Sequence, residues 1–193
     1  MNNNELIKLL NRASACSSSL LWLEKRDSKQ MYYDCERGDW LLWLLAILDA
    51  DSIKLKKAEA LCANTVRHLM KDERSRNVID VILNFCDGKA SARELDVAKN
   101  QAYAAYAAAY ATAYASAAYA AYAAAYAGGD NAAYAVYAAY AANAANAAAN
   151  AHAAGHSGGA MRRVALREMA SLVRSRIHTL EVLRAAASQW NSG

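Results

Sequence analysis

A long tract of alanine interrupted by tyrosine, between residues 100 and 154, restricts the fold more than any other feature of this chain. The tyrosines mostly stand three or four positions apart, and Asn143, Asn146 and Asn150 extend the series. Alanine has the highest helix propensity because it loses no side-chain entropy on folding, and the chain contains no proline. We therefore expect an uninterrupted helix over residues 92–127 and, after two glycines, further helix to about residue 154.

The remainder of the chain also has helical periodicity. Apolar residues recur at three- and four-residue spacing, and polar residues such as Ser91 and Glu94 form a capping box at a helix start. The alternating strand pattern of a β-sandwich is missing. We predict an all-α protein, a multi-helix bundle with long alanine-rich central helices. We divide it into an N-terminal helical subdomain, residues 1–90, and a unit of residues 91–193 that holds the Ala/Tyr helices and a C-terminal arginine-bearing helix.

The helix faces between the tyrosines consist of alanine and allow very close helix–helix approach. Because alanine buries little area per residue, such a helix needs extended contact, either with its own chain or with another copy. We expect a homo-oligomer whose interface includes these alanine-rich helices. The tyrosines have two open interpretations: they flank the alanine seams as packing residues, or they form a stacking wall for a purine or nicotinamide ring.

A candidate ligand site combines the tract with the start of the last helix. Arg163, Arg167 and Arg174 fall on one face of that helix, and guanidinium groups bind phosphate and carboxylate bidentately. A solvated or ion-paired face is the alternative. The predicted ligand-binding residues, which offer rings, amides, cations and loop polar groups, are Tyr103, Tyr106, Tyr110, Asn143, Asn146, Asn150, His152, His156, Ser157, Arg162, Arg163 and Arg167.

Charge and cysteine placement exclude several function classes. The net charge is +4, and the basic excess is concentrated in residues 160–193, which falls short of the dense basic face that DNA or RNA binding needs. The longest apolar run begins at Trp40 and is about half of the ~20 residues that span a bilayer. No signal peptide is evident. The four cysteines lack metal-ligand spacing. We expect a cytoplasmic protein without membrane contact, metal, cofactor or catalytic centre.

The most specific motif is Cys-Glu-Arg-Gly-Asp-Trp-Leu-Leu-Trp-Leu at residues 35–44. We expect Gly38 to be a left-handed residue at a tight corner between two helices. Asp39 then caps the second helix, and Trp40 and Trp43 anchor the core. These four residues are predicted as a structural motif.

This motif, followed by the Tyr/Ala repeats, resembles a widespread family of immunity proteins with an immunity-five-like domain, which is common in bacteriophage genomes. The resemblance covers about residues 5–180. Family members often end in a Cys-Ala-Asp-Ile-Val-Arg stretch, where this chain has Met-Ala-Ser-Leu-Val-Arg at residues 169–174. The resemblance implies a protein that neutralises a partner, and it supplies no catalytic residues.

We therefore predict a non-catalytic, phage-encoded immunity or anti-defence protein in the cytoplasm of a bacterial host cell. In the favoured version it binds and sequesters a nucleotide immune signal of the cyclic dinucleotide or cyclic ADP-ribose type. In a second version it inhibits a toxin or effector protein by direct contact. A third alternative is a structural or ice-binding helical protein, although Thr112 is the one threonine in the tract.

Overall fold

The computed structural model describes residues 3–26, 28–48, 52–109, 115–126 and 159–177. Its regular elements in those ranges are all helices, which confirms the all-α prediction. No helix in the described ranges is long and apolar enough to cross a membrane. The elements are α1 (Asn3–Arg12), α2 (Ser17–Glu24), α3 (Ser28–Asp34), α4 (Gly38–Ile47), α5 (Ser52–Asn64), the 3-10 helix η1 (Arg67–Leu69), α6 (Glu73–Cys86), α7 (Ala92–Ala109), α8 (Ala115–Tyr126) and α10 (Gly159–Arg176).

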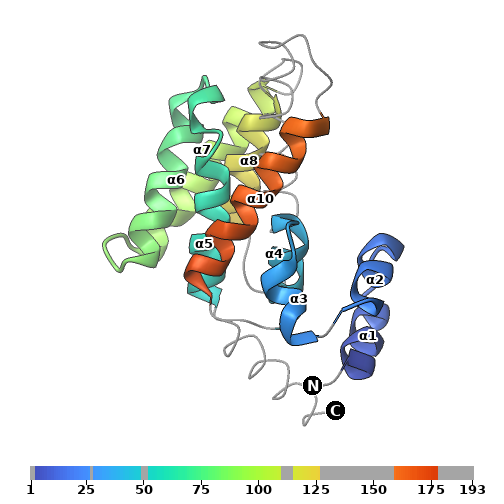
Figure 1. Ribbon diagram of the computed structural model, residues 1–193. Coiled ribbons are helices and arrows are strands. Elements are labelled where there is room, and N and C mark those ends of the chain that lie inside the picture. The colour runs from blue at the N-terminus through green and yellow to red at the C-terminus, as the bar shows by residue number, and fades with distance from the viewer. Residues whose placement is uncertain (1–2, 27, 49–51, 110–114, 127–158, 178–193) are drawn as a thin grey trace.

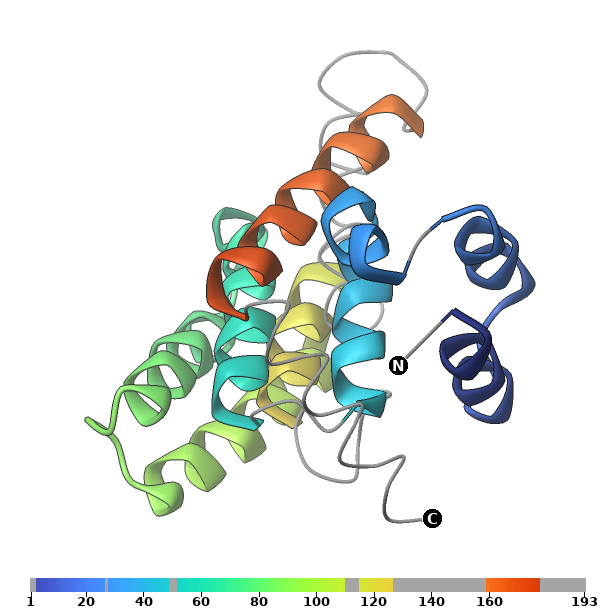
Figure 2. The same cartoon turned by 60° about the horizontal axis from the view of Figure 1, so that its bottom comes forward.

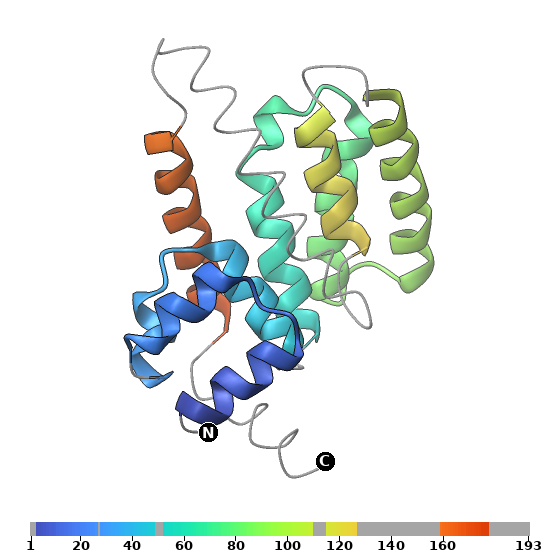
Figure 3. The same cartoon turned by 90° about the vertical axis from the view of Figure 1, so that its right-hand side faces the viewer.

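The helices form two groups, which are joined by α10 and by the direct contact of α4 with α5. Helices α5, α6, α7 and α8 pack together, and α10 packs against both α4 and α5 (Figure 1). Helices α3 and α4 lie between this group and the α1–α2 pair, as Figure 2 also shows. The side view in Figure 3 places α1 and α2 next to α3 and α4, on the side away from α6 and α7.

Helix α4 is at the centre of the core, as its apolar sequence predicts. Leu41, Leu42 and Leu45 are almost completely buried, because this helix is covered on several sides. The main core cluster also includes residues that follow position 90, such as Leu95 and Met169. The two-part division at residues 90 and 91 stays a prediction.

A fully buried carboxyl group interrupts the apolar core. Glu59 of α5 is 0% exposed, and neither of its carboxylate oxygens has a hydrogen-bond partner among the described residues. Burial raises the pKa of Glu59 to about 8, although the nearby ammonium of Lys56 opposes this shift. The carboxyl is therefore mostly protonated at neutral pH.

In its described part, the alanine–tyrosine tract forms two helices that pack against each other, α7 and α8, instead of one continuous helix. The rings of Tyr106 and Tyr119 are 4.9 Å apart, those of Tyr103 and Tyr122 are 5.6 Å apart, and α7 packs against α8. These nested contacts make α7 and α8 an antiparallel pair, so the predicted uninterrupted helix over residues 92–127 was wrong. Helix propensity is a local preference, whereas the reversal lets alanine faces pack within the chain.

Helix α8 buries its alanines against α5, α6 and α7. The alanine faces of α8 thus pack within their own chain. This is one of the two arrangements expected from the sequence, the other being contact with another copy. A homo-oligomer through these helices stays a prediction. The buried alanines are Ala117, Ala118, Ala120, Ala121, Ala123, Ala124 and Ala125.

The corner between α3 and α4 differs from its prediction in two residues. Gly38 is the first residue of α4 and does not have a positive φ; it is required because a Cβ there would lie 2.4 Å from the Cβ of Met169. Arg37, and not Asp39, occupies the N-cap position of α4. Asp39 lies in the first turn, where its carboxylate accepts two hydrogen bonds from the Arg37 guanidinium, at 2.8 and 2.5 Å.

Candidate functional site

A cleft of about 710 Å³ lies where α2, the α3–α4 connection and α10 meet. Its volume is within the range of roughly 300–1,000 Å³ that is typical of small-molecule pockets. Aromatic rings and charged groups of both signs line it. The lining residues are Trp22, Arg26, Asp34, Cys35, Glu36, Arg37, Trp40, Arg163 and Leu166.

The α3–α4 connection is fixed against α10 by backbone contacts. Arg174 donates hydrogen bonds to the carbonyl oxygens of Cys35, at 2.7 Å, and Tyr32, at 3.4 Å. The Tyr32 hydroxyl donates to the carbonyl of Ile177 at 2.7 Å. Because the last carbonyls of a helix lack intrahelical partners, Arg174 acts as a cap for α3. These contacts, with the close approach at Gly38, place the connection on the edge of the cleft.

The predicted face of arginines on α10 is confirmed as a geometric arrangement. Arg163 lines the cleft, the Nε of Arg167 donates to a carboxylate oxygen of Glu36 at 2.8 Å, and Arg174 binds the α3 carbonyls. All three guanidiniums therefore lie along the α3–α4 segment. That Arg163 and Arg167 bind a ligand stays a prediction.

Two arginine–tryptophan stacks form the aromatic part of the cleft. The Arg26 guanidinium lies over the Trp22 ring, 4.2 Å from its centroid, and Arg37 lies 4.5 Å from the centroid of Trp40. The two indoles meet edge to face, with centroids 6.1 Å apart and an interplanar angle of 68°. Such cation–π contacts stabilise a guanidinium in a defined position.

The cleft contains guanidiniums that no carboxylate neutralises. Arg37 is paired with Asp39, but Arg26 and Arg163 have no carboxylate partner among the described residues. Asp34 is an exposed carboxylate on the same lining. The guanidiniums of Arg26 and Arg163 and the carboxylate of Asp34 together give this part of the cleft a net positive charge. This charge favours the binding of an anion.

Cys35 does not provide a nucleophile for this cleft. Burial raises the pKa of its thiol to about 11, so the thiol stays protonated near neutral pH. The thiolate, and not the thiol, is the nucleophile and the metal ligand. Across the described part of the chain, no group of three or more His, Cys, Asp or Glu residues is arranged to hold a metal ion.

The structure brings only part of the predicted ligand-binding set to the cleft. Arg163 lines it and Arg167 pairs with a lining residue, whereas Tyr103 and Tyr106 contact the tyrosines of α8. The predicted residues that lie outside the described residues, or whose side chains do, are Tyr110, Asn143, Asn146, Asn150, His152, His156, Ser157 and Arg162.

Sequence reasoning missed the aromatic half of the cleft. Trp40 and Trp43 were expected to anchor the core; both pack against it and are half-buried, and Trp40 also lines the cleft. Trp22 and Arg26 were not singled out. A tryptophan with an arginine four positions away is a side-chain pair that can meet on a helix, and this spacing was the available signal.

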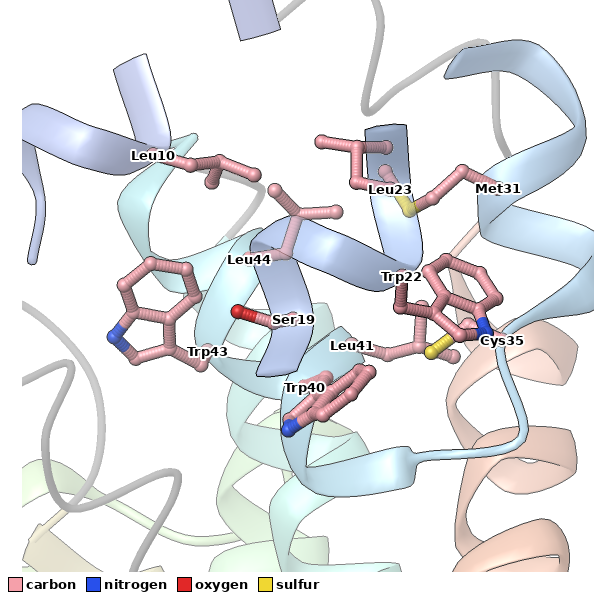
Figure 4. Close-up of a pocket in the computed structure, with 10 residues that line it drawn as sticks. All are labelled: Leu10, Ser19, Trp22, Leu23, Met31, Cys35, Trp40, Leu41, Trp43 and Leu44. Carbon is pink, nitrogen blue, oxygen red and sulfur yellow. The ribbon is translucent and has the colours of Figure 1, made fainter. Parts of the chain in front are cut away.

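A second, smaller pocket shares part of its lining with the cleft. It is an apolar pocket of about 30 Å³ whose lining includes Trp22, Cys35 and Trp40, which also line the cleft. Figure 4 shows the Trp22 and Trp40 rings next to each other, with Trp43 apart from them at another part of the lining. The two indoles therefore line both the cleft and the smaller pocket.

No family model, curated protein or solved structure matches this chain. The geometry of the cleft is thus the basis for a functional proposal, and the resemblance to immunity proteins stays a prediction.

Proposed function

We propose that this protein neutralises a bacterial immune signal by binding a nucleotide in the cleft without converting it. The observation that supports the proposal is the presence, in one cleft, of two indoles and two guanidiniums without carboxylate partners, Arg26 and Arg163. Guanidiniums bind phosphate oxygens, and bases stack on indoles. The two chemically different halves of a nucleotide thus each have a matching surface.

Sequestration is favoured over catalysis by the composition of the cleft. The described lining residues include no histidine, and the Cys35 thiol is protonated, so a nucleophile activated by a base is missing from that set. A binder present in excess lowers the free concentration of a signal by mass action alone. The proposal includes the phage origin, the bacterial cytoplasm as the compartment and the cyclic dinucleotide or cyclic ADP-ribose class of signal.

Calorimetry with cyclic dinucleotides and cyclic ADP-ribose isomers tests this proposal. We expect one of these nucleotides to bind, and to be recovered chemically unchanged after the protein is denatured. Replacement of Arg163 by alanine should weaken binding about tenfold or more, because a charged hydrogen bond to phosphate is lost. Arg176→Ala is the matched control, since Arg176 is exposed on the same helix and does not line the cleft.

Degraded nucleotide, or equal losses in both variants, would contradict the proposal. Binding of none of these nucleotides, together with co-purification of a toxin or effector, would favour the alternative of inhibition by direct protein contact. The ice-binding alternative is disfavoured by the buried alanine faces of α8, because a surface that binds ice must be exposed.

A further inference from the structure

We infer that the ligand of this cleft contains guanine, and that the carboxylate of Asp34 selects this base by accepting hydrogen bonds from its edge. The inference rests on the proposed function and adds the base and the residue that recognises it. Its basis is an exposed carboxylate on the lining of the cleft that has no cationic partner among the described residues.

Asp34 differs from the other carboxylates of its segment. Glu36 accepts a hydrogen bond from the Nε of Arg167 at 2.8 Å, and Asp39 pairs with Arg37. Each of these two carboxylates is thus neutralised within the fold. The carboxylate of Asp34 forms no ion pair and no hydrogen bond with the described part of the chain, although it lies on a cleft that several arginines line.

The place of Asp34 in its helix is unfavourable for a negative charge. It is the last residue of α3, and the last carbonyls of a helix carry partial negative charge that attracts cations. Arg174 of α10 supplies the cation, because it donates to the carbonyl oxygens of Tyr32 and Cys35, on either side of Asp34 (Figure 2). The packing of the chain therefore gives no reason for a carboxylate at this position. A residue that conflicts with its local structure is expected where a function requires it.

A free acceptor in this cleft defines what the ligand must supply. A carboxylate accepts hydrogen bonds and does not donate them, and it repels phosphate. The phosphates of a nucleotide therefore bind at Arg26 and Arg163, and Asp34 faces a part of the ligand that carries N–H or O–H groups. A cleft of about 710 Å³ is of the size that holds one small molecule, so one nucleotide meets both kinds of group.

Guanine is the base whose edge matches a carboxylate. Its N1–H and its N2 amino group are adjacent donors, which the two oxygens of one carboxylate accept together. Adenine places the acceptor N1 next to its amino group, so that a carboxylate oxygen meets a lone pair. Asp34 thus attracts guanine and rejects adenine, and specificity of this kind arises from both effects. Ribose hydroxyls also donate hydrogen bonds, but guanine and adenine nucleotides share them.

Calorimetry with cyclic di-GMP and cyclic di-AMP tests the inference, because these two members of the proposed ligand class differ only in their bases. We expect the wild-type protein to bind the guanine compound at least about tenfold more tightly, which is the value of one good bidentate contact. The corresponding inosine compound, which lacks the N2 amino group, should bind with intermediate affinity. In Asp34→Asn the preference should disappear, because an amide has a single acceptor oxygen, and the affinity for the adenine compound should not fall.

Glu24→Gln is the matched control. It also removes a negative charge, from an exposed position on α2 that does not line the cleft, and it should keep the preference for guanine. The ratio of the two affinities cancels any general effect of charge on anion binding. Thermal unfolding of Asp34→Asn should occur at no lower temperature than that of the wild-type protein, since a carboxylate at the end of α3 is unfavourable.

Equal wild-type affinities for the two dinucleotides, or binding of a cyclic ADP-ribose isomer alone, would overturn the inference and leave the proposed function standing. Equal loss of both affinities in Asp34→Asn would also overturn it, because the carboxylate would then serve a group that both compounds share, such as a ribose hydroxyl. If Asp34→Asn does not fold, the comparison of the two compounds on the wild-type protein still decides. Absence of binding for every one of these nucleotides would reject the proposed function together with the inference.

Discussion

At the scale of single residues, Glu59 links stability to pH. The pKa of its carboxyl in the folded protein is about 8, because of burial, against an ordinary value of 4.5. The folded state therefore holds this proton more tightly than the unfolded state, so the free energy of unfolding falls as pH rises from about 4.5 to about 8. Lys56, whose pKa is lowered by burial, moderates the effect.

Chemical unfolding at about pH 5 and about pH 9 measures this dependence. We expect the wild-type protein to lose a few kcal/mol more over this interval than Glu59→Gln, whose amide imitates the protonated acid and does not titrate. Comparison of the two proteins cancels the contributions of other titrating groups. The same pH dependence in both would mean that Glu59 is solvated or paired in solution.

Gly38 is the residue whose substitution should disturb both stability and the cleft. An added Cβ would lie 2.4 Å from the Cβ of Met169 and 2.8 Å from the backbone nitrogen of Ala170, so α10 must move away from α4. We expect Gly38→Ala to lower the free energy of unfolding by about 1–3 kcal/mol, as overpacking does. Gly88→Ala is the comparison: it has open space but a φ of +71°, and should cost about 1 kcal/mol through backbone strain. A smaller cost at Gly38 than at Gly88, in thermal unfolding, would show that α10 adjusts easily.

Residue-level predictions succeeded where the interaction is local in sequence. The Ser91 and Glu94 capping box is present, with hydrogen bonds of 2.7 and 3.2 Å between backbone nitrogen and side chain, because both partners lie in one helical turn. The roles of Gly38 and Asp39 were wrong because they depend on Met169, which is distant in sequence, and on the orientation of Arg37. Local spacing carries no information about such neighbours.

At the scale of elements, the antiparallel α7–α8 pair is held by tyrosines in mutual contact. Tyr122 is at their centre, with ring contacts to Tyr103, Tyr106, Tyr119 and Tyr126. We expect Tyr122→Ala to lower the free energy of unfolding by about 2–4 kcal/mol, less than truncation of a fully buried aromatic side chain costs, because Tyr122 is half-buried. Tyr103→Ala should cost clearly less, since Tyr103 is 54% exposed. Equal costs in urea unfolding would indicate that the two helices are joined mainly by their alanine faces.

Element-level predictions were right about helix content and wrong about one reversal. Helices α7 and α8 form because alanine favours helix, but the reversal of direction between them is not signalled by glycine or proline in the sequence. Folding back is favoured by packing against α5 and α6, and this is a tertiary effect. The stack of Arg26 on Trp22 was missed for a related reason, since spacing shows which side chains can meet but not that they face a cleft.

At the scale of the whole molecule, the cleft draws its charge from separate parts of the chain. Arg26 follows α2 and Arg163 is on α10, and both guanidiniums are accessible from solvent. We expect the affinity for the nucleotide that binds in calorimetry to fall severalfold when the salt concentration is raised from about 50 mM to about 500 mM, because exposed charges are screened. A titration at constant pH measures this. Affinity that is independent of salt would mean that apolar stacking alone holds the nucleotide.

The contacts between the α3–α4 connection and α10 have a consequence for how the protein is made. Arg174 and Ile177 are synthesised long after Cys35 and Tyr32, to which they bind. Chains begin to fold from the N-terminus during synthesis. One side of the cleft therefore forms only after α10, a late part of the chain, has left the ribosome. Before that point the nascent chain has no complete cleft and cannot bind a ligand there.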